Sequence, residues 1–293
     1  MTALFTRSRQ IFGLLLLILP FVPLYQLSGE SVDLKYAFSP YQWLLSIFIV
    51  AALSWLMAIS LPSWCSLIAG GLLRLGRIAE RFFIALCFSL SALAGWYCFA
   101  FKPHLIDVIV QLLQAKFFAA GMMAAPQPAL EAFFVTQHML MDGGQWYAQY
   151  APIHSLLLAL GAGVGAPWIM STLAATLAGW LLIDATRRMY DQRHAEVVAL
   201  LLLLSCFFIA MSASMMNHVT SFLWMSGALN LFVRWRSEPT AAKVFALGLV
   251  VGLGAATRSL EFVVVAPLAA VLMLPGLIAR RNFGSVIAGL LGG

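Results

Sequence analysis

The stretch FFIALCFSLSALAGWYCFAF, residues 82–101, runs for twenty residues without a charged side chain. A membrane-spanning helix needs roughly 17–25 predominantly apolar residues, so this stretch predicts a transmembrane helix. It is followed by KPHLIDVIVQLLQAKFF, residues 102–118, in which a carboxylate, Asp107, lies close to the end of the predicted span. Because a charged group near hydrocarbon is costly and often functional, Asp107 is the first candidate for a site.

The rest of the chain shares this apolar character. Of its 293 residues 62% are hydrophobic and only 10% are charged, which excludes an ordinary soluble domain and predicts an all-α polytopic membrane protein. The four cysteines occur singly, without the spacing of a metal or redox site. Besides 82–101, candidate spans are 10–27, 41–60, 167–186, 195–212, 219–235, 243–257, 260–278 and a segment beginning at 283. The expected fold is therefore about eight to nine transmembrane helices.

The basic residues indicate the topology of these spans. With the N-terminus in the cytoplasm, 13 of the 17 Lys and Arg residues fall on the inner side, as the positive-inside rule requires. The net charge of +6 is thus explained without nucleic acid, which is not expected as a partner. Two short apolar segments are not counted as spans. Residues 61–73 are interpreted as interfacial. Residues 151–165 are interpreted as re-entrant or lying along the outer interface, because a further span there would put three arginine clusters outside. The residues predicted on the outer side include one long loop, residues 102–166.

Residues 105–121 of this loop predict an amphipathic helix lying in the membrane interface, with little charge on it. Asp107, Gln111 and Gln114 share one face at helical spacing, and apolar residues fill most of the rest. One interpretation makes Asp107 a helix-start residue stabilised by the helix dipole. The other makes it part of a functional site. The pattern alone leaves both open.

A second short helix is expected at about 129–141, with Glu131, His138 and Asp142 on one face. These side chains are either a solvated surface or a polar pair, and they are too few to indicate a metal site. The following QWYAQYAP carries Trp146, Tyr147 and Tyr150, which suit either interfacial anchors or a platform for a ring-shaped substrate.

Two external turns also carry polar groups. The turn at 214–218 reads SMMNH, and the turn at 257–261 reads TRSLE. Arg258 either pairs with Glu261, three residues later, or meets an anionic group such as a lipid phosphate. Asp184, beside Arg187 and Arg188 at an inner boundary, is interpreted as structural.

The ordered series HLIDVIVQLLQAKFFAAG, DGGQWYAQYAPIHSLLLALG, FFIAMSASMMNH and AATRSLEF resembles the GT-C superfamily of integral membrane glycosyltransferases, which includes protein O-mannosyltransferases and lipid A aminoarabinose transferases. The resemblance runs from about residue 82 to 280. It divides the chain into an N-terminal two-span extension, 1–81, and a catalytic transmembrane region, 82–293, whose C-terminal part is expected to be missing. Departures from the family pattern are Val108, Ala151 and the Asn217-His218 pair.

The resemblance implies a sugar transfer from a polyprenyl-phosphate donor to a lipid, glycan or protein acceptor, with inversion at the anomeric carbon. It implies Asp107 as the catalytic base or acceptor-positioning group. The implied substrate-binding residues are Gln111, Gln114, His138, Tyr150, His154, Asn217, His218 and Arg258. No cofactor is implied, and whether a divalent metal assists is left open. The expected location is a bacterial inner membrane, in contact with membrane lipids, with the site on the periplasmic side.

Two other functions compete with this one. A transporter or flippase of an amphipathic lipid is the alternative, but such proteins carry repeated halves and broken helices near the midplane. The sequence has no internal repeat, and its polar residues gather at one face. A non-catalytic subunit that binds lipid carriers would need Arg258 but not Asp107. An Asp107→Asn substitution separates these hypotheses.

Overall fold

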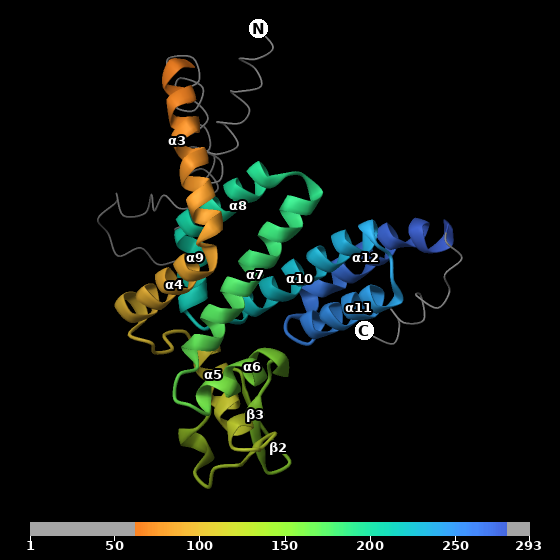
Figure 1. Cartoon of the computed structure of the whole chain (residues 1–293). Helices are drawn as coiled ribbons and strands as arrows, with labels where there is room; N and C mark the ends of the chain where they lie inside the picture. Colours follow the sequence, from red (N-terminus) through yellow and green to blue (C-terminus); the bar gives the residue numbers. More distant parts are fainter. Residues whose placement is uncertain (1–61, 280–293) are drawn as a thin grey trace, which may run out of the picture. The chain divides into compact units, whose positions relative to one another are not determined.

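The computed structural model describes residues 62–279, and its ribbon is drawn in Figure 1. The chain divides into two compact units, Met1–Arg74 and Leu75–Gly293, each taken by itself. Of the first unit, the described residues include only the beginning of helix α3 (Pro62–Arg81), which has a proline as its first residue. The predicted spans at 10–27 and 41–60, and the one beginning at 283, lie outside the described residues.

Most of the predicted spans in the second unit are helices, with ends that agree to within a few residues. The helices that correspond to single predicted spans are α4 (Phe83–Phe99), α7 (Trp168–Met189), α10 (Asn217–Ser237), α11 (Ala241–Ala255) and α12 (Ser259–Ala279). The predicted span 195–212 is instead two helices, α8 (Gln192–Leu204) and α9 (Cys206–Ala213). Ser205 separates them, and its hydroxyl caps α9 by accepting a hydrogen bond from Phe208 N at 3.2 Å.

Helices α7 and α10 pack along each other in the same direction. Ala174, Ala175 and Ala178 of α7 form a buried cluster with Val219 and Leu223 near the start of α10. Further along, Asn230 Nδ2 donates to Leu181 O at 3.0 Å. Small residues on α7 allow this close approach, as is common between membrane helices.

Helix α4 packs on another part of α7. Phe83, which is 2% exposed, forms a buried cluster with Cys87, Ile183 and residues of α8. A Cβ at Gly179 would overlap the Phe83 ring. A glycine is therefore needed at this contact.

Few of the described helices are both long enough and apolar enough to cross a membrane. Within residues 62–279, α7 alone is long and apolar enough. The total rises to three if the bent pairs α3–α4, at 86°, and α8–α9, at 63°, each count as one span. Helices α11, α12 and α6 (Pro152–Ala162) are apolar but shorter over their described residues. The number of eight to nine transmembrane helices is therefore not confirmed and stays a prediction.

The loop 102–166 is only partly helical. It contains the predicted helix, α5 (Ile106–Ala119), and then a three-stranded antiparallel sheet of β1 (Ala125–Pro126), β2 (Met139–Asp142) and β3 (Gln145–Ala148) in the order β1-β3-β2. The prediction of a second helix at 129–141 is wrong, because only Glu131–Phe133 form a short 3-10 helix there. Gly143 and Gly144 both have positive φ and make the two-residue turn between β2 and β3, a connection that favours a hairpin. The fold is therefore mainly α with a small sheet.

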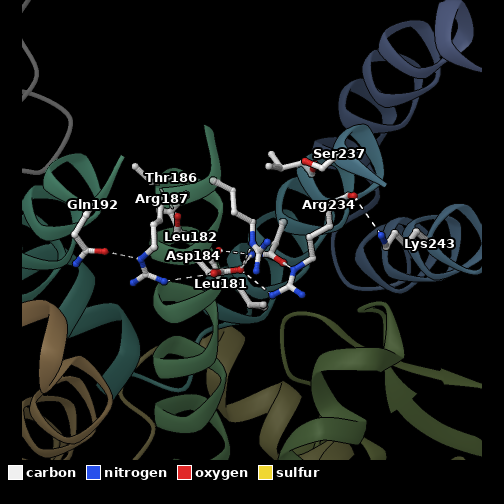
Figure 2. Close-up of polar contacts among 12 residues, drawn as sticks. Leu181, Leu182, Asp184, Thr186, Arg187, Gln192, Arg234, Ser237 and Lys243 are labelled. Atoms are coloured by element: carbon white, nitrogen blue, oxygen red, sulfur yellow. Dashed lines mark hydrogen bonds and ion pairs between the residues drawn. The ribbon is translucent and has the colours of Figure 1, made fainter. Parts of the chain in front are cut away.

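An ion-pair cluster joins the C-terminal ends of α7 and α10, and Figure 2 shows it. Asp184 Oδ2 accepts hydrogen bonds from Arg188 Nε at 2.9 Å, Arg234 Nη2 at 2.8 Å and Asn230 Nδ2 at 2.9 Å. Arg187 pairs with the other oxygen of Asp184 at 3.4 Å and with Glu80 of α3. Since all these partners belong to the protein itself, the contacts fit the structural role expected of Asp184.

Candidate active site

Asp107 lies in the first turn of α5, where its carboxylate contacts residues from the end of the same loop. Its Oδ1 accepts a hydrogen bond from the Tyr150 hydroxyl at 2.5 Å and lies 3.6 Å from His138 Nε2. The Asp107 side chain is 42% exposed. The residue before α5, Leu105, forms no side-chain cap. Asp107 therefore joins distant parts of the loop as well as lying at a helix start.

His138 is presented by the hairpin that follows it. Its backbone has φ 69°, a left-handed conformation that is uncommon for a residue other than glycine. Gln149 holds it twice: Gln149 N donates to His138 O at 3.0 Å, and the Gln149 amide nitrogen contacts His138 Nδ1. The rings of His138 and Tyr150 lie 5.3 Å apart. The hairpin thus brings His138 and Tyr150 together around Asp107.

Tyr150 remains a hydrogen-bond donor toward Asp107. Burial and the hydrogen bond to Asp107 both raise the pKa of Tyr150 above its ordinary value of 10. The phenol therefore keeps its proton at neutral pH. Trp146, by contrast, packs against Phe117 and Phe134 within the loop, so of the aromatic residues 146, 147 and 150 it is Tyr150 that meets the carboxylate.

Gln111 and Gln114 follow Asp107 on α5 but have different surroundings. Gln114 fixes the loop to the helix, since its Nε2 donates to Met123 O at 2.8 Å and its Oε1 accepts from Ala148 N at 2.9 Å. Gln111 is 2% exposed, and its Oε1 has no hydrogen-bond partner among the described residues. Both polar atoms of the Gln114 amide are therefore hydrogen-bonded within the protein. The Oε1 atom of Gln111, one turn from Asp107, has no such partner among the described residues.

His154 lies in α6 and connects that helix to the start of α10. Its Nδ1 lies 2.8 Å from Thr220 Oγ1 and its Nε2 lies 3.0 Å from Met215 O. The side chain is 1% exposed. Both nitrogens are thus engaged by the protein, and the structure does not place His154 at the Asp107 carboxylate.

Arg258, Asn217 and His218 form a second polar cluster where α10 and α12 begin. Arg258 Nη1 donates to Asn217 Oδ1 at 2.9 Å and lies 3.3 Å from His218 Nε2. Arg258 Nε pairs with Glu261 Oε1 at 2.5 Å, and the Ser221 hydroxyl donates to Glu261 Oε2. The predicted Arg258–Glu261 pair therefore forms, and the guanidinium has other partners as well.

The two clusters are neighbours. Three residues after Tyr150, Ile153 N donates to Ala256 O at 3.4 Å in the turn that carries Arg258. The pKa of His218 is lowered by burial and by the charge of Arg258, while Glu261 and Asp107 act in the opposite direction. The charges of Asp107 in the first cluster and of Arg258 in the second thus both act on His218.

Sequence reasoning missed several supporting residues. Gln149, Thr220 and Ser221 each hold a predicted site residue or its partner, and each carries a hydrogen-bonding side chain within a few residues of one. No local pattern marks them, because their partners lie far away along the chain. No group of three or more His, Cys, Asp or Glu side chains able to hold a metal ion occurs among residues 62–279.

A family model matches part of the chain. Residues 150–292 match a family model described as dolichyl-phosphate-mannose-protein mannosyltransferase, which is a GT-C family. The resemblance found in the sequence is confirmed over this range, which begins at Tyr150 and includes α6 to α12. The match does not include Asp107, Gln111, Gln114 or His138. No curated protein and no solved structure matches the chain.

Proposed function

We propose that this chain, whose residues 150–292 match a mannosyltransferase family, is a multi-pass membrane glycosyltransferase that uses a polyprenyl-phosphate sugar. The acceptor is a lipid, glycan or protein hydroxyl. The site lies at the outer, periplasmic face of a bacterial inner membrane. The arginines around Asp184, at the opposite ends of α7 and α10, support this orientation because basic residues favour the cytoplasmic side.

One observation carries the proposal: a carboxylate and a guanidinium occupy neighbouring clusters, each with atoms available to a ligand. Tyr150 holds Asp107 Oδ1, and the contacts described leave Oδ2 to an acceptor. Arg258 binds Glu261 and Asn217 through Nε and Nη1, and no partner of its Nη2 is found within residues 62–279. A base and a phosphate-binding cation are the two groups that this transfer requires.

In the proposed reaction, the acceptor hydroxyl attacks the anomeric carbon of the sugar from the face opposite the phosphate. The new bond joins the acceptor oxygen to that carbon, and the bond from the carbon to the phosphate oxygen breaks. Asp107 takes the proton of the hydroxyl, while the electron pair of the broken bond goes to the polyprenyl phosphate. Arg258 stabilises the charge that the phosphate gains. The configuration at the anomeric carbon is inverted.

The test is an Asp107→Asn substitution in the full chain, in membranes supplied with radiolabelled polyprenyl-phosphate mannose. A general base contributes roughly 10²–10⁴-fold to a rate, so we expect transfer to fall at least about 100-fold. The label is followed into lipid, glycan and protein fractions, which identifies the acceptor class. Asp142→Asn, at the exposed turn of the same loop, is the matched control. Undiminished transfer by the Asp107 variant, at equal protein level, would rule out the assigned role.

A further inference from the structure

We propose that Glu261 is a positioning residue that orients the Arg258 guanidinium toward the donor phosphate, an inference that rests on the proposed function. Glu261 lies in the first turn of α12, three residues after Arg258. The sequence alone left two alternatives for Arg258, a pair with Glu261 or a contact with an anionic group. The contacts in the structure fix the orientation of the Arg258 guanidinium within this pair.

The carboxylate of Glu261 is fixed at both oxygens. Oε1 accepts from Arg258 Nε at 2.5 Å, and Oε2 accepts from the hydroxyl of Ser221, one turn into α10. Ser221 attaches the Glu261 carboxylate to α10. The carboxylate therefore sets the position of Arg258 Nε, to which its other oxygen is bound.

The guanidinium is also fixed at a second edge. Asn217 Oδ1, at the start of α10, accepts from Nη1 at 2.9 Å. Since the five N–H donors of arginine lie in one plane, fixing Nε and Nη1 fixes the direction of Nη2 as well. The Arg258 side chain is 31% exposed, and no partner of Nη2 is found within residues 62–279, so Nη2 is left for a ligand.

Further hydrogen bonds hold the turn that carries Arg258 in place. Arg258 N donates to Gly254 O at 2.9 Å, and Thr257 Oγ1 accepts from Trp224 Nε1 of α10 at 2.9 Å. The turn that carries Arg258 is therefore attached to the same helix that supplies Asn217 and Ser221. A phosphate oxygen bound at Nη2 would meet a donor whose direction is set before binding, which reduces the ordering cost of binding.

The experiment compares Glu261→Ala with Glu261→Gln in the full chain reconstituted in lipid nanodiscs. Undecaprenyl phosphate serves as the binding probe, and polyprenyl-phosphate mannose as the donor. A hydrogen bond to a charged group is worth roughly tenfold or more in binding. We therefore expect Glu261→Ala to weaken probe binding and raise the donor KM about ten-fold, and to lower kcat as well, because the same guanidinium stabilises the charge that the leaving phosphate gains. Glu261→Gln keeps an acceptor for Nε and should stay within about three-fold of wild type in probe binding and donor KM.

A matched control comes from the other ends of the helices. Glu238 pairs with Lys243 Nζ at 3.0 Å and is 82% exposed, and Glu238→Ala should leave probe binding and donor KM unchanged. Equal losses in the Ala and Gln variants, or a wild-type donor KM in Glu261→Ala, would overturn the positioning role while leaving the proposed function intact. If wild-type protein fails to bind the probe and Arg258→Ala changes nothing, the donor assignment itself fails.

Discussion

At the scale of single residues, the structure separates side chains that can meet a ligand from those that hold the fold. Asp107 and Arg258 each have part of their polar surface available to a ligand, whereas Gln114 and His154 use theirs on the protein. Gln111 is intermediate, being buried with an unpaired oxygen. The residue types in the sequence therefore indicate which positions are polar, but not which of these side chains can meet a ligand and which hold the fold.

His154 predicts a pH dependence of stability. Burial lowers its pKa to about 4, against an ordinary 6.5, so below pH 6.5 the unfolded chain binds more protons than the folded one. Stability should fall as the pH drops from 6.5 toward 4, by about 2 kcal/mol at pH 5. Thermal unfolding of wild type and His154→Gln at pH 7 and pH 5 measures this. The non-titrating variant should lose less, and an equal loss in both proteins would contradict the prediction.

At the scale of secondary structure elements, the approach of α11 to α12 positions the second cluster. Gly254 in α11 allows the ring of Phe262, which is 1% exposed, to lie directly against the helix. The carbonyl of Gly254 also accepts hydrogen bonds from the backbone N–H groups of Thr257 and Arg258. The geometry of the Arg258 turn therefore depends on a position without a side chain.

A Gly254→Ala substitution should disturb this turn. The added methyl would overlap the Phe262 ring, and overpacking of this kind costs about 1–3 kcal/mol. We expect a lower melting temperature and weaker binding of undecaprenyl phosphate, with partial recovery when Phe262→Leu is added. Gly227→Ala in α10, where the new methyl would meet only ordinary contacts, should change neither property. A melting temperature equal to wild type in Gly254→Ala would show that the contact is not as tight as described.

At the scale of the whole second unit, polar side chains gather at opposite ends of α7 and α10. The ends near Asn217 face the candidate site, and the ends near Arg234 meet at Asp184 (Figure 2). This division matches the two sides that the basic residues predicted. The Asp184 cluster contacts other side chains of the protein, whereas the Arg258 cluster keeps polar atoms available to a ligand.

The Asp184 cluster should contribute to stability and not to sugar transfer. The Asp184 side chain is only 10% exposed, and its loss would leave three arginines without this partner. Breaking a buried ion pair costs about 3 kcal/mol, so Asp184→Ala should lower the melting temperature clearly. The transfer rate per folded molecule should stay within about two-fold of wild type. Asp191→Ala, at an exposed helix start, is the control, and a selective loss of transfer in Asp184→Ala would contradict this assignment.

The sequence by itself determined where most of the described helices lie, and it predicts that the basic residues gather on one side of the membrane, because apolar runs and charge positions are local properties of the chain. It also identified Asp107, Tyr150 and Arg258 as candidate site residues. It did not reveal the break at Ser205 or the hairpin after His138, since both lie in runs whose hydrophobicity suits a helix equally well. The strands that Gly143 and Gly144 connect were not predicted.

Only the tertiary structure decided which of these groups meet. Asp107 and Tyr150 are 43 residues apart, and Ser221 and Glu261 are 40 apart. Such contacts depend on how α5, the hairpin and the ends of α10 and α12 pack, and no periodicity of a single sequence encodes that packing. The same packing places His154 inside the protein and leaves the Arg258 side chain 31% exposed.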